Sequence, residues 1–140
     1  MQKNISSRQI RETFLSFFEK KDHLLIPCTS LLPQNDPTLL YINSGMAPLK
    51  KYFLGLSQPP HPKLCNVQLC IRTGDIEDAG DRHHFTSFEM LGSWSINDYY
   101  KETAIELAYE LLVERFGFPV DKLYATAHQP MRPAQSLGCP

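Results

Sequence analysis

The chain has 140 residues, of which 42% are hydrophobic and 21% charged, and this composition fits one globular domain with a single core. Its 14 basic and 15 acidic side chains leave a formal net charge of −1, so the chain as a whole lacks the basic surplus typical of nucleic-acid-binding proteins. No apolar run approaches the roughly 18 residues of a membrane helix, and residues 1–14 lack the apolar stretch of a secretory signal, so we expect a cytoplasmic protein with free thiols and no membrane partner.

The first predicted element is an amphipathic helix. Ser6 and Gln9 have the spacing of a capping box, in which each side chain satisfies the other residue's backbone N–H. Four apolar residues follow at helical spacing: Ile10, Phe14, Phe17 and Phe18. This pattern predicts a helix over residues 7–21 with an aromatic buried face.

Two short strands and a short helix are predicted next. Residues 24–27 indicate a short strand at a sheet edge, because its proline cannot donate a ladder hydrogen bond. Turn-forming residues at 33–37 precede a predicted buried strand at 38–42. A short helix is predicted at 47–54, and the prolines of residues 57–62 indicate an extended loop.

The segment 67–90 has the pattern of a β-hairpin with a long tip. Its first strand, residues 67–72, alternates with a period of two residues. One face carries Val67, Leu69 and Ile71. The other face carries Gln68, Cys70 and Arg72. Residues 73–81 are acidic and contain glycine, which indicates a loop, and strand character returns across residues 83–90.

A second long helix is predicted over residues 98–116, ending at Gly117 in the position after the helix. One side of this helix carries Ile105, Ala108, Leu112 and Phe116. Residues 123–127 form a last strand candidate, whereas residues 129–140 are rich in proline and polar residues and do not resemble packed structure. The order of elements predicts an α+β fold, and the glycine-rich phosphate loops of the common nucleotide folds are absent.

The hairpin offers a possible phosphate or nucleotide site. Arg72 ends the first strand on its polar side, where a guanidinium can bind a phosphate with two hydrogen bonds. Four residues of the returning strand share a face: His84, Thr86, Phe88 and Met90. His84 and Phe88 are about 13 Å apart on such a strand, which suits a phosphate partner at one end and an aromatic surface for a base at the other. Glu89 points to the opposite face.

Each of these residues has a commoner structural interpretation when taken alone. An arginine at a strand end is usually a solvated charge, and Phe88 by itself is more often a core residue. A zinc site from Cys65, Cys70, His83 and His84 is a minor alternative, because their spacing matches no common zinc pattern. Magnesium binding by the acidic loop is a minor alternative to a solvated loop. Periodicity alone therefore indicates an α+β domain with a possible phosphate site and assigns no metal ligand.

Several stretches resemble the alanyl-tRNA synthetase family of class II aminoacyl-tRNA synthetases, in the family's own order. They are residues 35–40 (NDPTLL), 43–46 (NSGM), 67–77 (VQLCIRTGDIE), 88–95 (FEMLGSWS) and 98–101 (DYYK). The resemblance extends from about Arg8 to His128. It implies the N-terminal part of the class II catalytic domain over residues 1–128, an antiparallel sheet with flanking helices, followed by an unstructured or aberrant tail.

The resemblance also implies an activity and a set of site residues. It implies an alanine–tRNA ligase that uses ATP with Mg²⁺, L-alanine and alanine tRNA, with zinc only in an editing region that these residues do not include. Arg72 corresponds to the arginine that binds the α-phosphate, and the family resemblance gives it the catalytic role. His84 corresponds to the γ-phosphate ligand, while Phe88 and Met90 belong to the ATP site. The residues expected near the nucleotide and the alanine pocket are Asn43, Gly45 and Met46.

The chain departs from the family pattern at three places. The histidine pair His83–His84 lies one position earlier, relative to residues 88–90, than in the family, and Asn97 stands where the family commonly has glycine. The sequence also ends before the family's third motif, with its second phosphate-binding arginine. A truncated or frame-shifted gene product that is not competent for catalysis alone is the leading interpretation. A free-standing, non-catalytic binding module derived from such an enzyme is the alternative.

Overall fold

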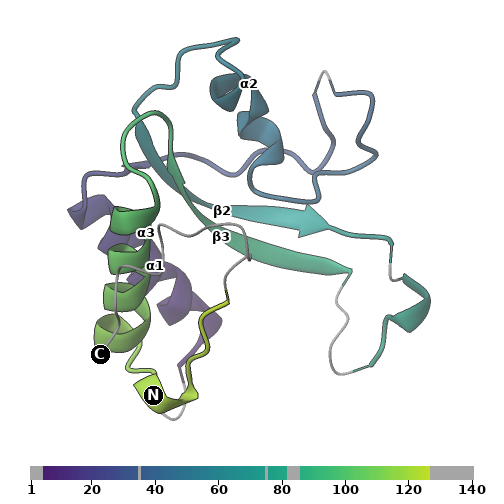
Figure 1. Ribbon diagram of the computed structural model, residues 1–140. Coiled ribbons are helices and arrows are strands. Elements are labelled where there is room, and N and C mark those ends of the chain that lie inside the picture. Colours follow the sequence, from purple (N-terminus) through teal and green to yellow (C-terminus); the bar gives the residue numbers. More distant parts are fainter. Residues whose placement is uncertain (1–4, 35, 75, 82–85, 127–140) are drawn as a thin grey trace.

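The computed structural model describes residues 5–34, 36–74, 76–81 and 86–126, with the side chain of Asp78 excluded. A three-stranded sheet has the order β1–β2–β3. The strands are β1 (Leu24–Leu25), β2 (Lys63–Ile71) and β3 (Ser87–Ser95). The main helices are α1 (Ser7–Lys20), α2 (Lys50–Phe53) and α3 (Lys101–Tyr109). Helices α1 and α3 lie together at one end of the hairpin, and α2 lies on the other side of the sheet (Figure 1).

This architecture confirms the predicted α+β class, with one difference in the sheet. The hairpin of β2 and β3 is antiparallel, but β1 pairs with β2 in parallel, so the sheet is mixed rather than purely antiparallel. β1 is a two-residue edge strand, as Pro27 predicts, because proline has no N–H to continue the ladder. In the part of the chain that the structure describes, no helix is long and apolar enough to cross a membrane.

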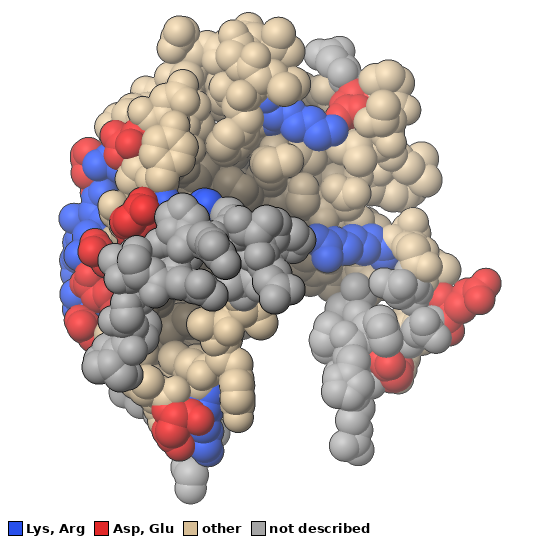
Figure 2. All heavy atoms as spheres, in the orientation of Figure 1, with Lys and Arg blue, Asp and Glu red and all other residues tan. Residues whose placement is uncertain are grey.

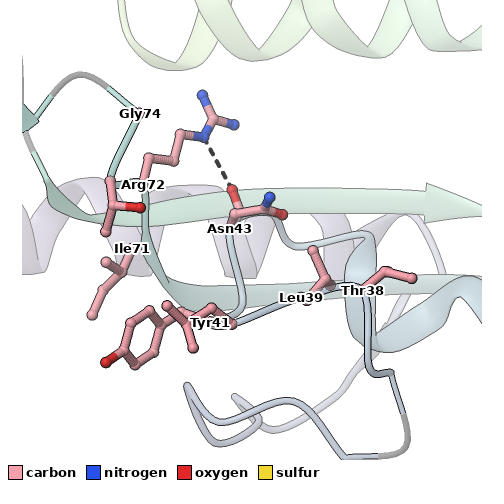
Figure 3. A pocket seen from close by; sticks show the side chains of 9 residues that line it. Thr38, Leu39, Tyr41, Asn43, Ile71, Arg72 and Gly74 are labelled. Carbon is pink, nitrogen blue, oxygen red and sulfur yellow. Dashed lines mark hydrogen bonds between the residues drawn. The ribbon is translucent and has the colours of Figure 1, made fainter.

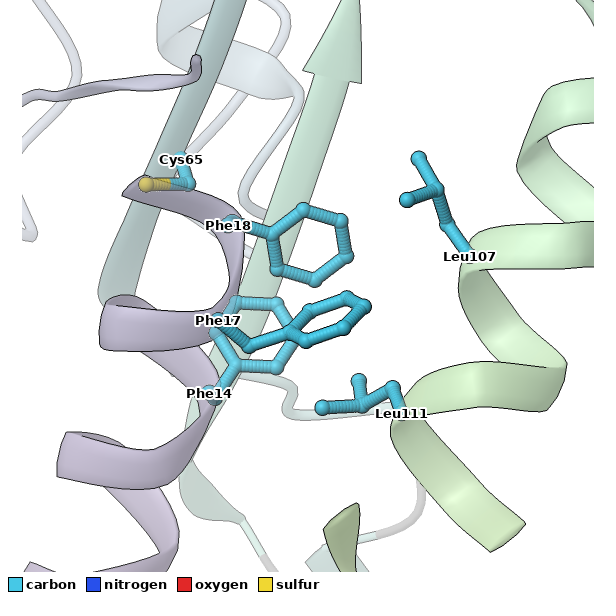
Figure 4. Close-up of a cluster of buried hydrophobic side chains, with 6 residues drawn as sticks. All are labelled: Phe14, Phe17, Phe18, Cys65, Leu107 and Leu111. Carbon is cyan, nitrogen blue, oxygen red and sulfur yellow. The ribbon is translucent and has the colours of Figure 1, made fainter. Parts of the chain in front are cut away.

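Helix α1 begins at the predicted capping box. The Ser6 N–H donates to Gln9 Oε1 at 2.9 Å, and the Gln9 N–H donates to Ser6 Oγ at 3.3 Å. The helix ends where Asp22 adopts a left-handed φ of 65°. Its phenylalanines pack against α3 and the sheet, and together they form the main core (Figure 4). The buried members of this core are Phe14, Phe17, Phe18, Cys65, Leu107 and Leu111.

Helix α3 begins at Lys101, three residues later than predicted, and continues as a π-helical turn over Glu110–Arg115. Ser95 explains the late start, because its hydroxyl accepts the Tyr99 N–H at 2.8 Å and donates to the Tyr99 carbonyl at 2.7 Å. The apolar side that helical periodicity indicates is not the side that packs on the core. Leu107 and Leu111 face the phenylalanines of α1, whereas Ile105 is 53% exposed. Leu112 and Ala108 are also exposed, and Phe116 is only partly buried. Gly117 has the predicted left-handed φ, at 68°.

The two faces of the hairpin are covered by different parts of the chain. Cys65 of β2 faces α1 and α3, whereas Leu64 packs with Leu49 and Ile96 on the α2 side. Even-numbered residues of β2 therefore point toward α2. The alternation of residues 67–72 is as predicted, but burial is reversed, since Gln68 and Cys70 are 0% exposed and Leu69 is 38% exposed.

Hydrogen bonding explains why a glutamine is buried there. Gln68 Oε1 accepts from the Thr29 N–H at 3.0 Å and the Thr29 hydroxyl at 3.1 Å. Its Nε2 donates to the carbonyls of Thr29 at 3.1 Å and Leu69 at 2.9 Å. A fully paired amide loses little on burial, so Gln68 fixes the segment around Thr29 to the sheet.

Two predicted strands are not formed. Residues 38–42 make bends and turns, because the Asp36 carboxylate accepts the Thr38 N–H at 3.0 Å and turns the chain away from an extended path. Ile42 makes only isolated contacts, accepting the Ile71 N–H at 2.9 Å and donating its N–H to Leu31 at 2.8 Å. Residues 123–126 are also irregular, with Tyr124 91% exposed. The predicted tail, 129–140, lies outside the described residues.

Two other predictions hold. The segment at 47–54 is helical, as a 3₁₀ turn over Ala47–Leu49 followed by α2. Residues 57–62 have no regular secondary structure, as their prolines predict. Together these elements place irregular chain over the α2 side of the hairpin, where the candidate site lies.

Candidate functional site

Arg72 and Phe88 share one face of the hairpin. Phe88 is paired with Cys70 in the ladder, and the Arg72 N–H donates to the Thr86 carbonyl at 2.9 Å, which extends the same register by two residues. The central guanidinium carbon of Arg72 lies 5.0 Å from the centroid of the Phe88 ring. This distance allows a cation–π contact between the guanidinium and the ring.

The segment Asn43–Met46 passes over the same face. Arg72 Nε donates to the Asn43 carbonyl at 3.1 Å (Figure 3). Two residues later, the Gly45 N–H donates to Met90 Sδ at 3.0 Å. The structure therefore brings together Arg72, Phe88, Met90, Asn43 and Gly45, while the neighbouring Met46 is 43% exposed.

A cavity of about 340 Å³ adjoins Arg72. It lies between the irregular segment 38–43 and the end of β2 (Figure 3). Its lining includes Leu39, Tyr41, Asn43, Ile71, Arg72 and Thr73. Phe88 does not line it; Arg72 lines the cavity, and its guanidinium carbon lies 5.0 Å from the centroid of the Phe88 ring. The arrangement offers a cation between a polar cavity and a flat apolar surface, which suits a molecule that combines phosphate with an aromatic base.

Trp94 supports this face, and sequence reasoning did not identify it. A Cβ on Gly92 would lie 2.5 Å from Trp94 Cζ2, and a Cβ on Gly45 would lie 2.8 Å from the same atom. The indole therefore rests against two glycines. Trp94 Nε1 donates to Asn66 Oδ1 at 3.1 Å, and Asn66 is 2% exposed. Gly92, two residues before the lone tryptophan, was a signal in the sequence, but it does not distinguish this packing from an ordinary turn, and Gly45 is distant in the sequence.

The other predicted residues do not all join the site. His83 and His84 lie outside the described residues. Glu89 points to the opposite face, as predicted, and pairs with Arg11 at 2.7 Å. The alternative zinc set is contradicted by the hairpin geometry, because Cys65 and Cys70 are an odd number of positions apart on one strand and face opposite sides.

The electrostatic environment of the site is mixed. Lys and Arg side chains are interspersed with Asp and Glu on the face shown in Figure 2, over the residues that the structure describes. Lys50 pairs with Asp36 at 2.8 Å, and this contact with that of Thr38 lowers the pKa of Asp36 to about 2. Lys63 pairs with Asp22 at 2.9 Å. Arg72 differs from these two lysines. It lines the cavity, and in the contacts described its side chain donates to the backbone carbonyl of Asn43 rather than to a carboxylate.

The chain is similar to known proteins over most of its length. The family model described as "tRNA synthetases class II (A)" matches residues 9–137. The alanine–tRNA ligase of Mycoplasmoides gallisepticum is 53% identical over 131 residues, covering 92% of this chain and 14% of the relative. That of Streptococcus sanguinis is 56% identical over 128 residues, covering 89% and 15%. That of Bacillus pumilus is 53% identical over 130 residues, covering 90% and 15%. The chain thus spans 14% to 15% of the length of these curated relatives.

Proposed function

The chain belongs to the class II tRNA synthetase family (A), and from this we propose that it forms the ATP-binding hairpin of an alanine–tRNA ligase. The observation that carries the proposal is the shared face of Arg72 and Phe88, with the guanidinium 5.0 Å from the ring. A nucleotide needs both a cation for its phosphates and a flat surface for its base. These two residues supply both, at positions where the family resemblance expects them.

We assign each residue a role in that site. Arg72 binds the α-phosphate, because its fork of donors matches phosphate oxygens and only Nε is used by Asn43. Phe88 stacks on adenine, and His84 binds the γ-phosphate. Met90 and the segment 43–46 border the nucleotide and the alanine pocket. The roles of Arg72, Phe88 and Met90 are supported by their shared face and by the cavity of about 340 Å³ beside Arg72, whereas the role of His84, which lies outside the described residues, rests on the family resemblance.

The proposed reaction has two steps. In the first, a carboxylate oxygen of alanine attacks the α-phosphorus of ATP, the bond to the β-phosphate oxygen breaks, and alanyl-adenylate and pyrophosphate form. In the second, the 3′ end of alanine tRNA accepts the alanyl group and AMP leaves. Neither step requires a covalent bond to the protein. Arg72 contributes by holding the α-phosphate in line and by neutralising charge that develops on its oxygens.

ATP, L-alanine and alanine tRNA are therefore the proposed partners, in the cytoplasm. Mg²⁺ accompanies ATP in this proposal, where it would neutralise phosphate charge. Within the described residues, no group of three or more His, Cys, Asp or Glu is placed to hold a metal ion. We accordingly assign no side chain of this chain to the magnesium ion.

Equilibrium binding of Mg-ATP tests the proposal. We expect the purified chain to bind Mg-ATP weakly, and Arg72→Ala to reduce the affinity about ten-fold or more, since hydrogen bonds to charged groups contribute about 1.5–3 kcal/mol. Arg11→Ala is the matched control, because Arg11 lies on the opposite face and pairs with Glu89 at 2.7 Å. Absence of binding by the wild-type chain, or an equal loss in both variants, would contradict the proposal.

A further inference from the structure

We propose that Trp94 is a positioning residue for the nucleotide site, acting through Gly45 and Asn43 on the guanidinium of Arg72. This inference rests on the proposed function and deepens it. Trp94 does not line the cavity beside Arg72. Neither the sequence patterns nor the family comparison assigns it a functional role.

The indole of Trp94 is fixed on several sides. Trp94 is paired with Leu64 in the ladder, and its ring lies back over Gly92, where a Cβ would be only 2.5 Å from Cζ2. Its Nε1–H donates to the buried Asn66 side chain at 3.1 Å. The ring of Phe53 approaches edge-on, with centroids 6.4 Å apart. A ring held by a hydrogen bond, a glycine and an aromatic edge has little freedom to shift.

Gly45 rests directly on this fixed ring. A Cβ at Gly45 would lie 2.8 Å from Cζ2 and 3.5 Å from Cη2 of Trp94, closer than a side-chain carbon can approach without displacement. The φ of Gly45 is not in the left-handed region, so its lack of a side chain serves this close approach and not a special backbone conformation. Its N–H donates to Met90 Sδ at 3.0 Å. Met90 lies on β3 four residues before Trp94, so two side chains of one strand fix Gly45.

The contact is transmitted to Arg72 over a short stretch of backbone. Asn43 lies two residues before Gly45, and its carbonyl accepts the Arg72 Nε–H at 3.1 Å. Ile42 fixes the segment on one side of Asn43, because its carbonyl accepts the Ile71 N–H at 2.9 Å, and Gly45 fixes it on the other. A shift of Gly45 away from the indole would therefore move the Asn43 carbonyl, and with it the Nε end of the guanidinium. Arg72 is exposed, and in the contacts described its side chain is held by this carbonyl and by the Phe88 ring, 5.0 Å from the guanidinium carbon. A displacement of about 1 Å at such a group is enough to cost a large factor in a phosphate site.

A double-mutant cycle on Mg-ATP affinity tests the inference. We expect Gly45→Ala to weaken Mg-ATP binding about ten-fold, because the new methyl group lifts the segment from the indole. Trp94→Phe removes the ring atoms Cζ2 and Cη2, so in that background Gly45→Ala should cost less than about three-fold. In the Arg72→Ala background, Gly45→Ala should cause no further loss, because the segment acts through Arg72.

The design separates this positioning role from a merely structural one. Urea unfolding of each variant establishes that the titrations are made on folded protein, and the measured quantity is affinity, not stability. Equal losses from Gly45→Ala in the wild-type, Trp94→Phe and Arg72→Ala backgrounds would overturn the inference and leave the proposed function standing. Failure of the wild-type chain to bind Mg-ATP would overturn the proposed function, and this inference with it.

Discussion

The guanidinium of Arg72 lies over the ring of Phe88, with its central carbon 5.0 Å from the ring centroid. The two residues come from opposite strands of the hairpin, and the ladder that pairs Cys70 with Phe88 brings them together. The cation therefore covers the ring on which we propose that adenine stacks. We expect adenine to take the place of the guanidinium on the ring, and the guanidinium to turn toward the phosphate.

The first prediction concerns catalysis by the isolated chain. We expect no alanine-dependent exchange of pyrophosphate into ATP, because the chain spans only 14% to 15% of the length of its relatives and half a site cannot recover the missing binding energy. The measurement is radiolabelled pyrophosphate exchange with and without alanine. Exchange that disappears in Arg72→Ala would show instead that these residues suffice for adenylate formation.

The second prediction tests which side of α3 is buried. We expect Leu107→Ala to lower the free energy of unfolding by about 2–5 kcal/mol, because Leu107 is 8% exposed and packs on the phenylalanines of α1. Ile105→Ala is the control, and at 53% exposed it should cost less than about 1 kcal/mol. Urea unfolding gives both values. A larger loss for Ile105→Ala would mean that the side of the helix that carries Ile105, and not the side that carries Leu107, packs on the core.

The third prediction concerns pH. Burial lowers the pKa of His23 from its ordinary value of 6.5, although the Lys21 carbonyl partly opposes this. The folded state therefore favours the neutral imidazole, which has Tyr99 Oη 2.8 Å from Nε2. This contribution to stability is present above pH 6.5 and is lost as the pH falls below it.

Thermal unfolding between about pH 8 and about pH 5 measures that loss. We expect His23→Gln, which cannot titrate, to show a shallower decrease in melting temperature than the wild-type chain over this interval. An equal or steeper decrease in the variant would mean that His23 does not carry the pH dependence.

The fourth prediction concerns thiol reactivity. Cys65 and Cys70 are 0% exposed, and burial raises the pKa of both thiols, that of Cys65 to about 11. Cys28 is exposed. Because the thiolate is the reactive form, iodoacetamide should modify Cys28 in the folded chain and reach Cys65 and Cys70 only in urea. The fourth cysteine, Cys139, lies outside the described residues and does not enter the comparison. Peptide mass mapping distinguishes the sites, and modification of Cys65 as fast as Cys28 would contradict the buried placement.

The sequence predicted the elements whose patterns are local. The capping box at Ser6 and the phenylalanine spacing defined α1 almost to the residue, because both depend on neighbours within one or two turns. The alternation likewise placed Arg72 on the face of Gln68 and Cys70, and the register of the hairpin adds that Phe88 of β3 lies on this face. Pro27 correctly indicated a strand that ends at a sheet edge.

One error arose from a local side-chain turn, and the others arose where distant contacts decide the structure. Residues 38–42 have strand-forming composition, but the Asp36 side chain bonds to Thr38 and turns the chain. The buried side of α3 depends on where α1 lies, which periodicity along α3 cannot define. Burial of Gln68 depends on Thr29, and the support given by Trp94 depends on the distant Gly45. The tertiary contacts that complete the site were therefore the part that could not be predicted.

The most direct test of the Arg72–Phe88 site is a calorimetric comparison of Mg-ATP with magnesium tripolyphosphate, which lacks the nucleoside. We predict that Arg72→Ala weakens binding of both ligands about ten-fold or more, whereas Phe88→Leu weakens binding of Mg-ATP by a similar factor and leaves tripolyphosphate binding unchanged. If Phe88→Leu instead affects both ligands equally, or neither, the ring does not hold the base and the two residues do not form one nucleotide site.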